Sequence, residues 1–214
     1  MNIEFALPML GDYKDNPYPM PEDYNYWKAR SDRTFFIDYE IGEDYPDGTS
    51  DNRLIELCKT IIQMNQDEKD IPKEKLEPIY IYIYTYGGDM CQAESLCDIC
   101  LSSRIPIVTI GMGVAMSAGF LILLAGHRRY AFKHCQMLVH SGSAGFQGTA
   151  EQIEEAQRNY KKQLAEVKDY ILSRTEIDEK VFNRNKSKDW YLKKEEVVQY
   201  KVIDKYIDSL EDIF

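Results

Sequence analysis

The chain has 214 residues, of which 44% are hydrophobic and 29% charged, a composition typical of a soluble globular domain with one substantial core. Its 36 acidic residues outnumber its 26 basic residues, and the formal net charge of -10 disfavours binding to nucleic acid or anionic membranes. No secretory signal and no membrane-spanning apolar stretch is recognisable. Five cysteines, an odd number, without an export signal predict reduced thiols and a cytoplasmic location.

The first part of the chain, residues 1–32, is rich in Tyr, Pro and Asp and shows no sustained periodicity. We therefore predict an extended arm that ends in a short helix near Tyr26–Arg30. The following apolar segment RTFFIDYEI, residues 33–41, predicts the first strand.

Two polar loops are expected next, with a helix between them. The first loop covers residues 43–52, and its Thr49, Ser50 and Asp51 are candidate N-caps for a helix through RLIELCKTIIQMNQ. The second loop covers residues 66–78, which are polar and contain prolines.

The segment IYIYIYTY, residues 79–86, alternates Ile with Tyr and predicts a strand with one face in the core. It ends at Gly87 and Gly88, after which MCQAESLCDICLSS predicts a helix. Cys97 and Cys100 form a CxxC pair within this helix. Because no second pair of zinc ligands is recognisable, we interpret both as buried thiols.

The second half of the chain continues the alternation of strands and helices. IPIVTI predicts a buried strand, GMG (111–113) a turn, and VAMSAGFLILLAG a helix. RRYAF and CQMLVH (135–140) predict two strands that form a hairpin. A long helix is expected over 149–175, followed by a short KDWYL segment, a helix through EEVVQYK and a closing VIDKYIDSL. This pattern indicates a single α/β domain.

Ser117 interrupts an apolar run at the predicted start of a helix. The first N–H groups of a helix lack partners and carry partial positive charge. The amide of Ala118 could therefore donate to an oxygen that gains negative charge beside Ser117. Gly88, at the end of a neighbouring strand, could supply a second donor, and two such donors form an oxyanion hole. The alternative interpretation is that Ser117 only caps the helix.

A nucleophilic serine requires a base, and the chain has three histidines. His127 lies on the same predicted helix, roughly 15 Å from Ser117 at 1.5 Å per residue, which excludes it unless the helix breaks early. His134 lies in a Lys-bearing turn and is expected to be exposed. His140 ends an apolar strand, where sites gather in α/β sheets. It is the candidate base, with a purely structural histidine as the alternative, and spacing identifies no carboxylate.

Four motifs, in the order IYIYIYTYGG, GVAMSAG, MLVH-x4-GFQG and KDWYLKKEEVVQYKVID, resemble the ClpP family of serine peptidases. The resemblance covers about Tyr26 to Asp204. It implies a ClpP/crotonase-like α/β fold of repeated β-β-α units with a protruding handle helix. The implied division is an N-terminal arm and short helix, residues 1–32, and a peptidase domain, residues 33–214, whose handle helix covers about 149–175.

The resemblance also implies the roles of individual residues. Ser117 is the expected nucleophile, His140 the base and Asp189 the orienting acid, without a metal or organic cofactor. The amides of Gly88 and Ala118 are the expected oxyanion donors.

Further implications concern substrate and assembly. Substrate contacts are expected at Gly87, Asp89, Ser143 and Gly145, the last two on or before a GFQG strand that flanks the bound peptide and pairs across rings. Two seven-membered rings of this chain would enclose the sites, and a ring ATPase would deliver unfolded polypeptides. The expected function is a serine endopeptidase that hydrolyses unfolded or short polypeptides inside this tetradecameric chamber.

Several residues depart from the family pattern. The usual Asn-Ser-Pro before the two glycines is Tyr84–Tyr86, and an acidic residue and an arginine before the aspartate are Ser187 and Lys188. Lys201 replaces a helix-ending glycine. The alternatives are therefore a divergent paralogue or phage-type maturation peptidase that acts without an ATPase, and an acyl-CoA enzyme of the crotonase type.

The interval between the candidate nucleophile and base is also unusual. Ser117 and His140 are 23 residues apart, which is short for the family. We expect a tight RRYAF hairpin to absorb the difference.

Overall fold

The computed structural model describes residues 21–46 and 48–213. Of the N-terminal region predicted over residues 1–32, residues 1–20 lie outside the described residues, and the short helix expected near Tyr26–Arg30 is part of a helix over Pro21–Ser31. The strands are β1 (Thr34–Ile37), β2 (Ile79–Thr85), β3 (Ile107–Met116), β4 (Arg128–Phe132), β5 (Gln136–Val139), β6 (Trp190–Tyr191) and β7 (Lys205–Ile207). The helices are α1 (Pro21–Ser31), α2 (Arg53–Asp67), α3 (Met90–Ser102), α4 (Ala118–Leu124), α5 (Ala150–Arg174), α6 (Glu179–Asn185) and α7 (Lys194–Gln199), with 3-10 turns at Lys73–Lys75 and Leu210–Asp212.

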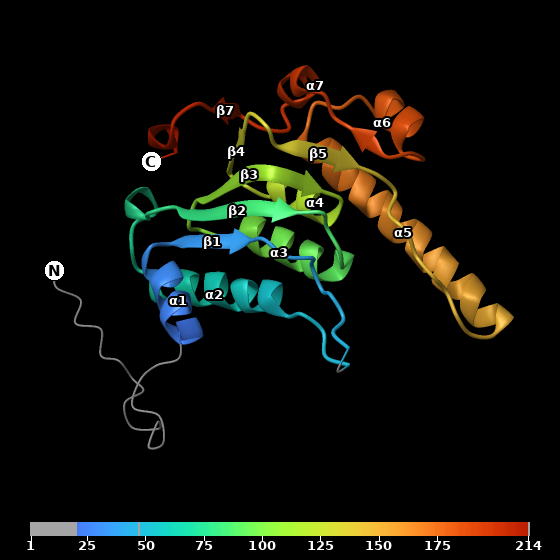
Figure 1. Cartoon of the computed structure of the whole chain (residues 1–214), viewed down its shortest axis with the longest axis horizontal. Coiled ribbons are helices and arrows are strands. Elements are labelled where there is room, and N and C mark those ends of the chain that lie inside the picture. Colours follow the sequence, from blue (N-terminus) through green and yellow to red (C-terminus); the bar gives the residue numbers. More distant parts are fainter. Residues whose placement is uncertain (1–20, 47, 214) are drawn as a thin grey trace.

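A seven-stranded sheet organises the molecule, with strands in the order β1-β2-β3-β4-β7, all parallel (Figure 1). Strand β5 runs parallel to the second half of β3, and β6 pairs antiparallel with β5. Parallel strands joined through helices define the α/β class, which confirms the fold class expected from the sequence.

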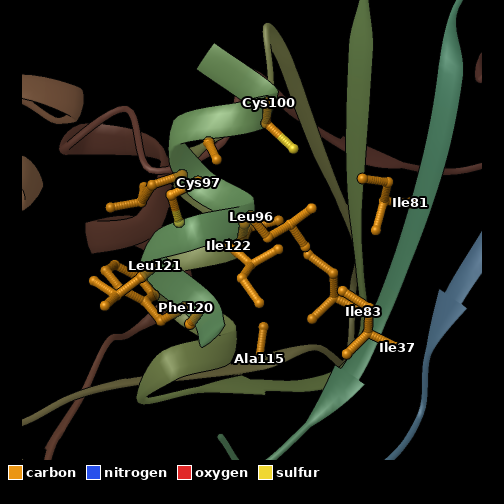
Figure 2. Close-up of a cluster of buried hydrophobic side chains, with 14 of the residues drawn as sticks. Ile37, Ile81, Ile83, Leu96, Cys97, Cys100, Ala115, Phe120, Leu121 and Ile122 are labelled. Carbon is orange, nitrogen blue, oxygen red and sulfur yellow. The ribbon is translucent and has the colours of Figure 1, made fainter. Parts of the chain in front are cut away.

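Helices α2, α3 and α4 share one hydrophobic core with one face of the sheet. Ile37, Ile81 and Ile83 from the strands meet Leu96 of α3 and Phe120 of α4 in this core, and all five side chains are fully buried (Figure 2). Full burial of each contributes about 1.5–3 kcal/mol to folding. Helix α4, which follows Ser117, is therefore held inside the protein rather than on its surface.

The Ile and Tyr side chains of β2 separate as predicted. Ile79, Ile81 and Ile83 are fully buried beneath the helices, whereas Tyr84 on the opposite face is 44% exposed. The alternation places the Ile side of β2 in the main core, whereas the Tyr side faces a second, smaller cluster in which Tyr82 is buried with Val108 and Ile110. Helix α5 extends away from the sheet, with its first residues at the far tip (Figure 1).

The predicted turn at 111–113 is wrong, because β3 continues through these residues to Met116. Gly113 has a φ of +74°, and a Cβ there would lie 2.6 Å from the Tyr84 ring. The register between β2 and β3 also shifts between Ile83 and Thr85. The glycines therefore allow a bend in the strand and the close approach of a tyrosine. Helix α4 consequently begins only at Ala118.

The predicted hairpin of RRYAF and CQMLVH is also wrong. Strands β4 and β5 both run parallel to β3 and pair with successive parts of it. Ala131 pairs with Gly111, and Gln136 pairs with Val114 further along β3. A short outward turn at residues 133–134 therefore separates two strands that run in the same direction. This direct continuation, and not a tight hairpin, accommodates the short interval between Ser117 and His140.

The start of α2 differs slightly from the expectation. Asn52 is the cap residue, without a side-chain hydrogen bond, in place of Thr49, Ser50 or Asp51. The buried Asp51 carboxylate nevertheless accepts a bond from the Arg53 N–H at 2.9 Å, and it pairs with the Arg53 guanidinium. None of the helices in the described part of the chain combines the length and apolar character needed to cross a membrane.

Candidate active site

Ser117 forms the junction between β3 and α4. Its backbone has φ 53° and ψ -121°, a conformation that residues with a Cβ rarely adopt. The N–H of Ser117 donates to the carbonyl of Leu138 on β5 at 3.1 Å, which holds this strained turn against the neighbouring strand. A strained serine between a strand and a helix is the arrangement by which the nucleophile elbow of α/β-hydrolases exposes its hydroxyl.

His140 follows β5 and meets this hydroxyl. Met116 pairs with Leu138 in the parallel ladder, so the ends of β3 and β5 lie side by side. The Nε2 atom of His140 lies 2.7 Å from the Ser117 Oγ atom, within hydrogen-bond distance. The strand register thus brings together two residues that are far apart in the sequence.

The other two histidines lie elsewhere. His134 is exposed in the turn between β4 and β5, as expected. His127 lies beyond the end of α4 at Leu124, so the assumption that it shares the helix of Ser117 is wrong. Its Nδ1 atom accepts a hydrogen bond from the N–H of Ile107 at 2.9 Å, and burial lowers its pKa. This histidine has a structural contact and is separate from Ser117.

Asp189 lies on the other side of the His140 ring. Its Oδ1 atom is 3.5 Å from His140 Nδ1, an ion-pair distance that is longer than a well-aligned hydrogen bond. The next residue, Trp190, pairs with Val139 in the antiparallel β5–β6 ladder. Trp190 is buried and packs edge-on against Tyr200, with 6.2 Å between the ring centroids. The position of Asp189 follows from this pairing, although its own side chain is 65% exposed.

The end of β2 lies directly against Ser117. A Cβ added to Gly87 would be 2.7 Å from the Cβ of Ser117 and 3.1 Å from the backbone N of Ala118. A side chain at this position would displace the serine, so only glycine allows the approach.

Gly88 makes a second close approach, to the backbone of Ile41. The N–H of Ile41 donates to Gly87 at 2.8 Å, and the N–H of Asp89 donates to Ile41 at 2.7 Å. In such a parallel bridge the N–H of the intervening residue, Gly88, points to the opposite side. Within the described residues, no hydrogen bond occupies the N–H of Gly88 or of Ala118.

A cavity of about 420 Å³ opens beside Ser117 and His140. Two of the expected substrate contacts, Asp89 and Ser143, line it. Gly87 lies against Ser117, whereas Gly145 is exposed and is not part of the lining. Much of the remaining lining is apolar and comes from α3, α4, β5 and α5: Met90, Phe120, Leu121, Val139, Leu164 and Ile171. This size and the mostly apolar lining are typical of a ligand-binding pocket.

Tyr160 of α5 is a further cavity residue, which no motif in the sequence singles out. Its hydroxyl donates to the carbonyl of Ser141 at 2.9 Å, and its ring packs edge-on against Phe146. It thus connects α5 to the segment that follows His140. Residues 141–148, in which the resemblance implies a strand, contain no strand in the single chain.

Acidic and thiol groups lie near the site without joining it. Glu94, Asp98 and Glu166 line a second cavity of about 240 Å³, and burial, followed by the charge of Glu166, raises the pKa of Glu94. Cys97 and Cys100 are free and buried, which confirms their interpretation as buried thiols. Over residues 21–46 and 48–213, no group of His, Cys, Asp and Glu side chains is arranged to hold a metal ion.

Comparison with known proteins connects this geometry to a family. The Clp protease family model matches residues 56–209, a range that includes Ser117, His140 and Asp189. Proteolytic subunit 2 of the ATP-dependent Clp protease from Treponema denticola is 33% identical over 139 residues, which cover 64% of this chain and 70% of the relative. The corresponding subunit from Treponema pallidum is 29% identical with the same coverage. The proteolytic subunit from Deinococcus radiodurans is 28% identical over 138 residues, with 64% and 68% covered.

Proposed function

This chain belongs to the Clp protease family and is a serine peptidase, and we propose that Ser117, His140 and Asp189 form its catalytic triad. The observation that carries the proposal is the position of His140 between the other two residues. Its Nε2 atom lies 2.7 Å from the Ser117 hydroxyl, and its Nδ1 atom lies 3.5 Å from the Asp189 carboxylate.

In the first half of the reaction, His140 takes the proton of Ser117 while the serine oxygen attacks the carbonyl carbon of a peptide bond. The Asp189 carboxylate favours the imidazole tautomer with its proton on Nδ1, and it stabilises the imidazolium that forms. His140 then gives the proton to the leaving amine. Water hydrolyses the acyl-serine in the second half of the reaction, with His140 again as base.

The tetrahedral intermediate carries a negative oxygen that needs donors. We assign this role to the N–H groups of Gly88 and Ala118, which have no acceptor within the described residues and flank Ser117. Amides held in place before the reaction stabilise developing charge without reorganisation. This chain's residues supply all the groups for this mechanism without a metal or cofactor.

The substrate and the assembly form the second part of the proposal. The apolar cavity beside Ser117 receives a side chain of an unfolded or short polypeptide, with Asp89 and Ser143 at its edge. The names of the three relatives describe subunits of an ATP-dependent protease. We propose that this chain likewise forms two stacked heptameric rings that enclose the active sites, and that a ring ATPase is its partner. The alternative is a specialised peptidase that acts without an ATPase.

The Ser117–His140 contact also favours peptide hydrolysis over an acyl-CoA reaction. Hydratases and isomerases of the crotonase type polarise a thioester in an oxyanion hole and do not require a serine, a histidine and an aspartate together. A thermal shift with acyl-CoA and none with peptide inhibitors would support that alternative. The five free cysteines agree with the proposed cytoplasmic location, where thiols stay reduced.

Hydrolysis of a short fluorogenic peptide by three variants tests the triad. We expect Ser117→Ala and His140→Ala each to lower kcat by at least about 1,000-fold. Asp189→Asn should cost less, about 10- to 100-fold, because the carboxylate is exposed and 3.5 Å from the ring. Asp178→Asn, which changes the N-cap of α6 and none of the proposed triad residues, is the matched control. Wild-type activity in Ser117→Ala would contradict the proposal.

A further inference from the structure

Helix α4 begins directly after Ser117, and the carbonyls at its C-terminal end need hydrogen-bond donors from outside the helix. An α-helix leaves its last four carbonyls without partners inside the helix. In α4, with only seven residues, these are the carbonyls of Leu121–Leu124. One of them, that of Ile122, accepts from the N–H of Ala125 at 3.0 Å. The other three depend on side chains from other elements.

Each of these three carbonyls receives a side-chain donor. The hydroxyl of Thr109, on β3, donates to Leu123 at 2.7 Å. The hydroxyl of Tyr170, on α5, donates to Leu121 at 3.1 Å. Burial raises the pKa of Tyr170 far above its ordinary value, so this hydroxyl keeps its proton and remains a donor.

Arg174, at the last position of α5, supplies the remaining donors. Its Nε atom donates to the carbonyl of Leu124 at 2.9 Å, and its Nη2 atom donates to the carbonyl of Gly126 at 2.8 Å. The planar guanidinium thus spans two carbonyls, and its positive charge complements the negative end of the helix dipole. Arg129 donates from Nη1 to the backbone carbonyl of Arg174 at 2.6 Å, which fixes the arginine itself.

Because all seven residues of α4 are buried, the helix has little freedom to move except as a unit. A shift at its carbonyl end therefore reaches Ser117 at its other end. We infer that Tyr170 and Arg174 are positioning residues, which hold α4 so that the Ser117 hydroxyl stays within reach of His140 and the oxyanion donors. This inference rests on the proposed function, since it concerns the same nucleophile.

If Tyr170 and Arg174 had a purely structural role, their loss would lower stability without a specific effect on the reaction. Two control variants measure how much a comparable loss of stability alone changes the activity. Arg104 donates from its guanidinium to the carbonyls of Lys69 and Ile71, at 2.6 Å and 3.0 Å, just after the end of α2. Helix α2 contributes none of the proposed catalytic residues, so Arg104→Ala is the control for Arg174→Ala. Tyr206→Phe is the control for Tyr170→Phe, because the Tyr206 hydroxyl is buried and makes no hydrogen bond within the described residues.

The test measures kcat and KM of the assembled full-length enzyme on a fluorogenic peptide, together with the rate of Ser117 labelling by a fluorophosphonate. We expect Arg174→Ala to lower kcat and the labelling rate by about 10- to 100-fold, with KM changed by less than about twofold, because a small displacement of a nucleophile is costly. Tyr170→Phe should lower kcat by about fivefold. Ethylguanidinium at millimolar concentration should partly restore kcat in Arg174→Ala and leave Arg104→Ala unchanged.

Equal kcat and labelling rates in Arg174→Ala and Arg104→Ala would overturn the inference, as would a loss that ethylguanidinium does not reverse. If Arg174→Ala does not fold, Tyr170→Phe and Arg174→Lys provide the same comparison, and unchanged kcat in both would overturn it. Absence of Ser117 labelling in the wild-type enzyme would instead refute the proposed function. The two failures are therefore distinguishable.

Discussion

The backbone of Ser117 is strained, and this strain lowers the stability of the fold while placing the proposed nucleophile. Its φ of 53° and ψ of -121° correspond to a turn position dominated by glycine. A side chain in the left-handed region costs roughly 1–2 kcal/mol, so the fold must hold Ser117 there through its neighbours. The bond from its N–H to Leu138 and the close contact with Gly87 are two such constraints.

This strain leads to a prediction about two inactive variants. Ser117→Gly should have a free energy of unfolding about 1 kcal/mol higher than that of Ser117→Ala, because glycine adopts the backbone conformation without strain. Denaturant unfolding of both variants in the same buffer measures the difference. A glycine variant that is less stable than the alanine variant would show that the turn is unstrained.

Sequence patterns could single out Ser117 and His140 as candidates, but not Asp189. Ser117 interrupts an apolar run, and His140 ends a strand, so each is locally conspicuous. Asp189 is one of 36 acidic residues, and its place beside the histidine depends on the pairing of Trp190 with Val139. The family resemblance supplied that residue, because pairing between distant strands leaves no local signal.

At the scale of elements, the junction of α3 and α5 brings acidic groups together. Glu94 of α3 faces the second cavity with Glu166 of α5, and burial and this neighbouring charge raise the pKa of Glu94 above its ordinary value of 4.5. A raised carboxyl pKa means that the folded state favours the neutral acid. Stability from this group is therefore present at acidic pH and is lost as the pH rises through its pKa.

Glu94→Gln should consequently raise the melting temperature at pH 7, where the carboxylate is charged. The gain should shrink as the pH falls towards 4, where wild-type Glu94 becomes neutral as well. We expect a gain of a few tenths of a kcal/mol, because Glu94 is only partly buried and solvent screens its charge. Melting curves of Glu94→Gln and of the exposed control Glu154→Gln from pH 4 to pH 7 measure it. A gain that does not depend on pH would contradict this explanation.

Strand β2 was predictable and the course of β3 was not, for a physical reason. Alternating Ile and Tyr side chains specify a strand with two different faces, whatever its neighbours are. Glycines such as Gly111 and Gly113 are compatible with a turn and with close packing, and only the Tyr84 ring against Gly113 decides between them. The outward turn between β4 and β5 was likewise indistinguishable from a hairpin, because the sequence does not reveal that β3 lies beside both.

For the molecule as a whole, the contacts within a single chain do not explain why α5 is so long. It extends away from the sheet, and in the described part only Ile171 on it is fully buried (Figure 1). A long helix with little burial has little to stabilise it in isolation, which favours packing against another chain.

The proposed assembly therefore predicts the mass in solution. Fourteen chains of 25.0 kDa give a particle of about 350 kDa, and sedimentation velocity or native mass spectrometry measures it directly. Seven chains, about 175 kDa, would indicate a single ring. A monomer with full peptidase activity would contradict the enclosed chamber while leaving the proposed triad intact.

The proposed nucleophile is most directly tested by covalent labelling with a fluorophosphonate, followed by peptide mass spectrometry. We expect one modified residue, Ser117, with labelling abolished in Ser117→Ala and slowed at least about 1,000-fold in His140→Ala. Labelling that persists in Ser117→Ala at the wild-type rate would mean that the peptidase uses a different nucleophile.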